Sequence, residues 1–197
     1  KPKYRDEWTE DKASDLSSSP QDLAETLTCC DDAYVRKEDG NANFGALADL
    51  ILYNAADDLI AYIKFDISST PLDKLQEGVT LRLVCYQGSA GGSIAVRKVA
   101  DTSWTEGTIT WNNKPDTGDS ITSKSNTGVG TYDFDLGTYP RDQKKAGKDY
   151  ISLFLIHSTP TLYFRSKEYN GDDPILLLLG FKEGGVFKNR INAAYRT

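Results

Sequence analysis

The chain has 197 residues, of which 39% are hydrophobic, and a formal net charge of -6 at pH 7. This length suits one all-β domain with a sizeable core. The negative charge argues against nucleic acid or an anionic membrane as a partner, because the summed field repels phosphate. No apolar run approaches the ~20 residues of a membrane span. Since neither a signal segment nor a methionine is present, we expect a processed product or a piece of a larger multidomain chain.

The composition changes along the chain in a way that predicts three parts. Residues 1–27 are polar and acidic and lack a strand period, which predicts an N-terminal arm. Residues 28–180 carry the apolar pattern of a folded domain. Residues 181–197 are basic and predict a C-terminal extension.

Short runs with alternating apolar residues, separated by Gly, Asn, Asp and Pro, begin near residue 33. They predict nine strands, at 33–37, 48–54, 59–67, 79–87, 92–99, 131–136, 150–157, 161–168 and 174–180. Residues 70–79 are expected to supply one helical turn, and residues 139–150 a second turn or a loop. Nine strands without a long amphipathic helix favour an all-β sandwich of two antiparallel sheets.

The three cysteines, Cys29, Cys30 and Cys85, have no C-x-x-C spacing, which argues against a metal cluster. Three interpretations remain open at this point. Cys85 could form a disulfide with Cys29 or Cys30, all three could be structural thiols, or the adjacent pair could be a redox site.

The residues that nucleophilic catalysis needs are scarce. His157 is the only histidine, and it lies in the apolar run 151–157, where a strand-end or core histidine is expected. No phosphate-binding loop is present, and the spacing of the abundant acids marks no glycosidase pair. We therefore expect a protein that is not an enzyme.

Residues 104–115, WTEGTITWNNKP, hold two of the three tryptophans. Trp104 and Trp111 are seven apart, so one uninterrupted strand would place them on opposite faces. A turn at 107–108 would instead divide the segment into two strands, and Pro115 would end the second. One or both rings are expected to fill the core of the sandwich, with ligand stacking by at least one as the alternative.

Six segments resemble one known family in sequence and in order. They are DAYVR (32–36), NANFG (41–45), YIKFDIS (62–68), LRL (81–83), VADTSWTEGTITWNNKP (99–115) and LYFRSKE (162–168). Over residues 27–180 the chain resembles the DNRLRE domain, which overlaps carbohydrate-binding module family ninety-six. The resemblance implies a non-catalytic jelly-roll β-sandwich appended to polysaccharide-degrading enzymes or cell-surface proteins, and therefore extracellular or at the cell surface. It also implies acidic polysaccharides, such as alginate, as ligands.

Alternation along the strands predicts which residues face outward. The apolar sets Ala33 and Val35, Ile63, Phe65 and Ile67, Leu81, Leu83 and Cys85, and Leu162 and Phe164 are expected to face the core. Tyr34 and Tyr86 then face outward, as do six residues predicted to bind the ligand: Arg36, Lys64, Arg82, Arg165, Tyr62 and Tyr163. Arginine suits a carboxylate through two parallel hydrogen bonds, and a tyrosine ring suits a sugar face. Edge protection or ordinary solvated surface is the alternative.

No cofactor is expected, although a structural calcium ion fits the segment around residues 31–41. Asp31, Asp32, Asp39 and Asn41 offer the oxygen atoms that calcium prefers. Asp39-Gly40-Asn41 is equally a turn signal, so no ligands are assigned. The sequence thus predicts a module that binds an acidic, uronic-acid polysaccharide. The alternative is a structural or adhesion module of a surface or matrix protein without a sugar site.

Overall fold

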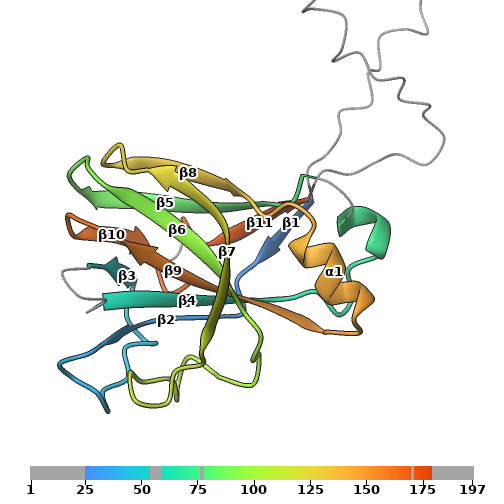
Figure 1. Ribbon diagram of the computed structural model, residues 1–197, viewed down its shortest axis with the longest axis horizontal. Helices are drawn as coiled ribbons and strands as arrows, with labels where there is room; N and C mark the ends of the chain where they lie inside the picture. Colours follow the sequence, from blue (N-terminus) through green and yellow to red (C-terminus); the bar gives the residue numbers. More distant parts are fainter. Residues whose placement is uncertain (1–24, 54–58, 76–77, 170, 179–197) are drawn as a thin grey trace, which may run out of the picture.

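Runs of alternating apolar residues form the strands of two antiparallel sheets, which pack face to face in the computed structural model (Figure 1). The structure describes residues 25–53, 59–75, 78–169 and 171–178. No helix among these residues is long and apolar enough to cross a membrane. The expectation of an all-β sandwich is confirmed.

The first sheet, called the β5 sheet, is built around its longest strand, β5 (Thr80–Gly88). One edge of β5 pairs with both β10 (Leu162–Arg165) and β11 (Ile175–Leu178), which follow each other along it. The other edge of β5 pairs with β8 (Gly130–Asp135). Beyond β10 lies β3 (Asp49–Leu52), and beyond β11 lies β1 (Glu25–Thr28).

The second sheet, called the β4 sheet, has the order β2-β4-β9-β6-β7. Its strands are β2 (Asp31–Arg36), β4 (Leu59–Asp66), β9 (Tyr150–His157), β6 (Ser93–Val99) and β7 (Thr117–Ser125). The short 3-10 helix η1 (Leu72–Leu75) and the helix α1 (Tyr139–Lys145) lie together at one end of the sandwich (Figure 1). Both occur within the segments where the sequence predicts a turn.

Two strands, β1 and β7, were not predicted. β7 is polar and lies at the edge of its sheet, where no residue of the strand is fully buried, so its sequence carries no apolar alternation. β1 begins at Glu25, inside the segment expected to be a polar arm. It was missed because Leu27 is the only residue of this strand that packs against the core, so the strand shows no apolar alternation.

The core between the sheets contains the side chains that alternation predicted. Phe65, Leu83 and Phe164 are buried in one apolar cluster together with the remaining predicted members of β4, β5 and β10. For β2 the prediction was wrong. Tyr34 faces this core, and Ala33 and Val35 face the opposite side of the sheet, where they are also buried.

The outer face of the β4 sheet is covered by residues 100–116, here called the tryptophan loop. Its Trp104 and Ile109 pack with Tyr62 and Phe154 in a second apolar cluster. Neither strand arrangement considered for this segment forms, and Trp104 is buried in this second cluster and not in the core between the sheets. The sandwich thus has two buried layers, one between its sheets and one beneath this loop.

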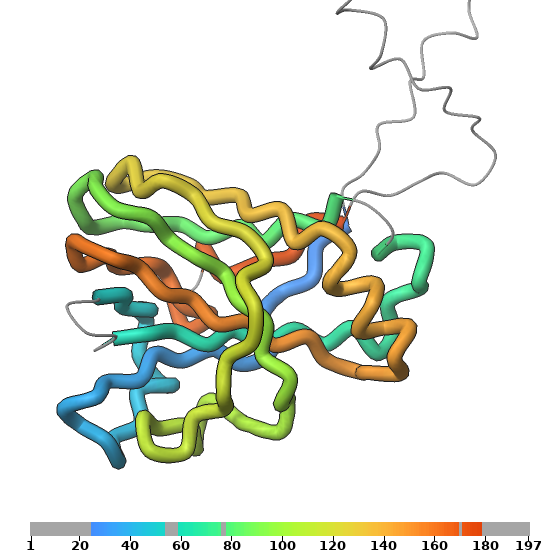
Figure 2. Tube along the Cα trace, in the orientation of Figure 1, coloured from blue at the N-terminus to red at the C-terminus, as the bar shows by residue number. Residues whose placement is uncertain are grey.

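Hydrogen bonds to a second loop, residues 37–48 between β2 and β3, hold the tryptophan loop in place. The Asn43 side chain donates to the carbonyl groups of Glu106 and Ile109, and the Asn112 amide donates to Asn41 Oδ1 at 2.9 Å. Figure 2 shows the two loops side by side below the sheets. The NANFG and WTEGTITWNNKP motifs therefore meet in space, which gives both a structural role.

Candidate functional site

The outer face of the β5 sheet carries a cluster of aromatic rings around one arginine. Tyr163 and Arg165 come from β10, Tyr86 comes from β5, and Tyr169 comes from the turn that follows β10. Alternation in β5 and β10 turns Tyr86, Tyr163 and Arg165 away from the core, which takes up Cys85 and Phe164. These four residues are here called the tyrosine–arginine face.

Arg165 lies between two tyrosine rings. Its Cζ is 3.6 Å from the centroid of the Tyr86 ring and 3.4 Å from that of Tyr169. Stacking of this kind attracts a cation to both ring faces and fixes the plane of the guanidinium. Among the described residues Arg165 has no hydrogen-bond acceptor or ion-pair partner, and its Nε is buried. The in-plane N–H groups are therefore oriented but not neutralised.

The Tyr86 ring is fixed in turn by its neighbours. Its hydroxyl donates to Asp49 Oδ1 at 2.7 Å, and its centroid is 6.2 Å from that of Tyr163. Burial, together with this hydrogen bond, raises the pKa of Tyr86 to about 12, so the phenol stays protonated at neutral pH. Partly exposed rings and a polar group in fixed positions are the features that hold a sugar.

A hollow of about 260 Å³ lies beside this face, between β5 and the turn before β11, and its lining includes Arg82, Val84 and Asp173. Arg82, Val84 and Tyr86 alternate along β5, so Val84 in the lining of the hollow lies about 7 Å along the strand from Tyr86 in the ring cluster. Arg82 donates to both carboxylate oxygens of Asp133 at 2.7 Å. This pairing lowers the pKa of Asp133 and leaves Arg82 with its charge already compensated.

Of the six residues predicted to bind the ligand, the structure brings three to one face: Arg82, Tyr163 and Arg165. Arg36 lies in the β4 sheet and pairs with Glu38 at 2.9 Å and Asp39 at 3.2 Å. The four bases are thus divided between the two sheets, and three of them are engaged in ion pairs.

The prediction that Lys64 and Tyr62 face solvent was wrong, because the tryptophan loop covers their side of the β4 sheet. Lys64 is 5% exposed, and its Nζ lies 2.9 Å from Asp31 Oδ2. Tyr62 is 0% exposed and donates to the Pro115 carbonyl at 2.8 Å. Both residues hold the loop to the sheet.

Sequence reasoning did not assign Tyr86 or Tyr169 to the site. Tyr86 faces outward as predicted, but only the β5–β10 pairing places it beside Arg165. Tyr169 follows the end of β10, where alternation no longer applies. The only local signal that Tyr169 could reach Arg165 is their spacing of four residues at a turn.

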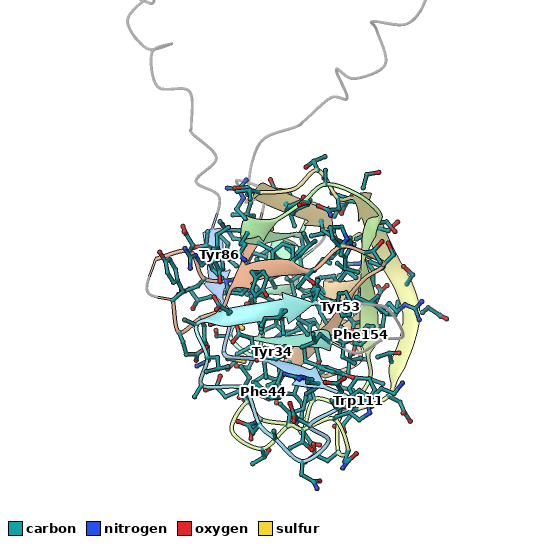
Figure 3. All side chains as sticks on the ribbon, turned by 90° about the vertical axis from the view of Figure 1, so that its left-hand side faces the viewer. Tyr34, Phe44, Tyr53, Tyr86, Trp111 and Phe154 are labelled. Atoms are coloured by element: carbon teal, nitrogen blue, oxygen red, sulfur yellow. The ribbon has the colours of Figure 1, made fainter. Side chains whose placement is uncertain are left out.

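A separate hollow of about 300 Å³ lies over the β4 sheet beside Trp111 and Lys114. Lys114 Nζ is 4.0 Å from the Trp111 ring centroid and donates to the Trp111 carbonyl at 3.0 Å, so it covers one ring face. Figure 3 shows Trp111 well apart from Tyr86. A larger hollow of about 480 Å³ has one ring in its lining, Tyr139, which is itself buried. Neither offers an open ring beside an unpaired guanidinium.

The histidine and the three cysteines, which could serve in nucleophilic catalysis, lie in structural positions. His157 is buried, with Nδ1 2.9 Å from the Ser93 carbonyl and Nε2 3.3 Å from the Asn126 amide, as expected for a core histidine. The three cysteines are free thiols. Burial raises the pKa of Cys29 and Cys85, and it raises that of Cys30 to about 11. These thiols are therefore poor nucleophiles at neutral pH.

Two comparisons with known proteins found sequences similar to this chain. The family model described as "Carbohydrate-binding module family 96" matches residues 24–180. A gellan lyase from a Bacillus species is 32% identical over 127 residues, covering 59% of this chain. The chain spans only 5% of that relative's length.

Proposed function

Since the chain belongs to carbohydrate-binding module family 96, we propose that it is a non-catalytic module that holds an acidic polysaccharide on the tyrosine–arginine face. Its match to 5% of a longer lyase supports a role as one module of a larger chain. A polysaccharide ligand of this kind further implies an extracellular or cell-surface location.

The observation that carries the proposal is the guanidinium of Arg165 between the rings of Tyr86 and Tyr169. Because both faces of the guanidinium are covered, a carboxylate can approach only along its edge, where two parallel hydrogen bonds form. A sugar carrying that carboxylate would then lie next to Tyr163, whose ring offers an apolar surface. Arg165 thus recognises one uronate, and the rings supply contact area that is independent of charge.

The other predicted bases contribute less to this ligand. Asp133 already neutralises Arg82, so the hollow beside it suits hydroxyl groups of the sugar better than a second carboxylate. Exposed charged contacts are individually weak, and because Arg165 is the unpaired guanidinium among the described residues of this face, the salt dependence should be moderate.

Binding is tested by calorimetry with alginate, carboxyl-reduced alginate and gellan, at low and high salt. We expect alginate to bind more tightly than its carboxyl-reduced form, and the difference to shrink in high salt. Arg165→Gln should weaken alginate binding about tenfold or more, since a hydrogen bond to a charged group contributes about 1.5–3 kcal/mol. The same substitution should change binding of the carboxyl-reduced polymer much less.

Arg97→Gln is the matched control. It removes one positive charge from an exposed position in β6, on the other sheet, and should leave alginate binding unchanged. Equal losses in the two variants would mean that overall charge, and not this face, attracts the polymer. Failure of the parent to bind any of the three glycans would exclude the proposal.

One observation favours a second candidate, a structural or adhesion module without a sugar site. The bases predicted to form one cluster are divided between the two sheets, and Arg36, Lys64 and Arg82 pair with acids of the same chain. Such a module would bind none of the glycans, and its tyrosine–arginine face would only stabilise the β5 sheet. In that case Arg165→Gln would lower the melting temperature without changing any glycan titration.

A further inference from the structure

Three carboxylates from distant parts of the chain meet at the edge of the sandwich near the start of β2. Asp32 comes from β2, Glu106 from the tryptophan loop and Glu168 from the turn after β10. Each offers an oxygen atom that lies within 4.8 Å of those of the other two. Two oxygens bound to one calcium ion at about 2.4 Å cannot be more than about 4.8 Å apart, so the spacing matches a shared ion.

The buried oxygens of this group are not fully satisfied by the protein. Asp32 is 0% exposed, and its Oδ1 has no hydrogen-bond partner among the described residues. Its other oxygen accepts from the Lys167 backbone N–H at 2.9 Å. Glu168 Oε2 is likewise buried without a hydrogen-bond partner. A buried carboxylate oxygen without a partner is costly and points to a missing cation or donor.

The charges of the group leave an excess that one divalent cation would balance. Lys167 Nζ lies 2.8 Å from Glu106 Oε1 and 2.6 Å from Glu168 Oε1, so it compensates one of three negative charges. The neighbouring Asp31 is already paired with Lys64.

We propose that Asp32, Glu106 and Glu168 form a binding site for calcium. All three ligands are carboxylates, which suit a hard cation, and no sulfur or imidazole ligand belongs to the group. Bound there, the ion joins β2, the tryptophan loop and the turn that carries Tyr169. Of the four residues around 31–41 that suggested calcium in the sequence, only Asp32 belongs to the group. Asp39 pairs with Arg36, and Asn41 accepts from Asn112.

The site is tested on the full chain after treatment with a chelator. Calcium should raise the melting temperature in a saturable way, because an ion that binds only the folded state stabilises it. Terbium should give luminescence when tryptophan is excited, since Trp104 is two residues from Glu106, and calcium should displace it. Glu168→Gln should weaken calcium binding at least tenfold, and Asp119→Asn, an exposed acid in β7, should not.

The proposal is wrong if calcium changes neither the melting temperature nor terbium emission of the parent, or if Glu168→Gln responds as the parent does. Should Glu168→Gln fail to fold, Glu106→Gln takes its place. The titration of the parent decides by itself whether the protein binds calcium. No polysaccharide enters these measurements, so their failure would leave the proposed glycan binding untouched.

Discussion

At the scale of single residues, Lys64 shows how a charged side chain in a strand can belong to the interior. Its ammonium lies 2.9 Å from Asp31, donates to the Trp104 carbonyl, and is 4.9 Å from the centroid of the Trp104 ring. Every partner comes from outside β4. The lysine therefore neutralises and holds two other segments, a role that its own strand sequence does not reveal.

Lys64→Ala is expected to destabilise the protein by about 3 kcal/mol, because it leaves the Asp31 carboxylate partly buried without its counter-ion. Urea unfolding followed by circular dichroism measures the change. Arg36→Ala, which breaks only exposed ion pairs, is the control and should unfold almost as the parent does. Similar losses in both variants would contradict the assignment of Lys64 to the interior.

Cys30 is a second residue whose reactivity is set by its surroundings. Burial, followed by the nearby Asp31 carboxylate, raises its pKa to about 11, so about one thiol in a thousand is ionised at pH 8. Alkylation of the native protein at pH 8 should be slow, and it should accelerate as the pH rises toward 11. Mass spectrometry of iodoacetamide-treated samples measures this. Rapid native labelling of Cys30 at pH 8 would contradict the expected shift.

At the scale of elements, the tryptophan loop is positioned by a close approach of two backbones. A Cβ atom added to Gly45 would collide with the Glu106 carbonyl oxygen, so only glycine fits without a shift. The same carbonyl accepts from the Asn43 side chain. The loop can cover the β4 sheet because this segment has no side chain at the point of contact.

Gly45→Ala should therefore destabilise the protein by about 1–3 kcal/mol and loosen the tryptophan loop. Gly107→Ala lies in that loop, has no atom within 4 Å of the added Cβ, and serves as the matched control. Denaturant unfolding with tryptophan fluorescence as the signal separates the two variants. If Gly107→Ala proved as damaging as Gly45→Ala, the close contact would not be the reason.

At the scale of the whole molecule, the two ends of the described chain lie side by side. β1 pairs with β11 in register from Glu25–Leu178 to Thr28–Ile175, so the chain enters and leaves the sandwich at neighbouring points. β1 also covers the outer edge of β11, which would otherwise expose unpaired backbone groups. One edge of the β5 sheet is thus formed by a strand at the start of the domain.

A chain that begins at Cys29 should be less stable than one that begins at Glu25 by about 2 kcal/mol, from the lost packing of Leu27 and the lost β1–β11 hydrogen bonds. Thermal and urea unfolding of the two shortened proteins measures the difference. Both should retain the β-sheet spectrum. Equal stability would mean that β1 contributes only marginally to the domain.

The predictable part of the fold consists of the strands that bury one face. Phe65, Leu83 and Phe164 were placed correctly because alternation is visible within one strand. β7 was missed because a polar edge strand has no such contrast. The candidate site was predictable only in part. Tyr163 and Arg165 share a strand, but Tyr86 and Tyr169 join them through strand pairing and a turn.

Taken alone, the sequence determined that the chain forms β-strands, which side chains share a face of each strand, and to which family the motifs point. These properties repeat every two residues or lie in short motifs, so they are local. The tertiary structure alone decided which face of the β4 sheet is covered, which bases are neutralised, and that Arg165 stands between two rings. Those outcomes depend on which distant segments pack against each strand, because burial and ion pairing are set by neighbours in space.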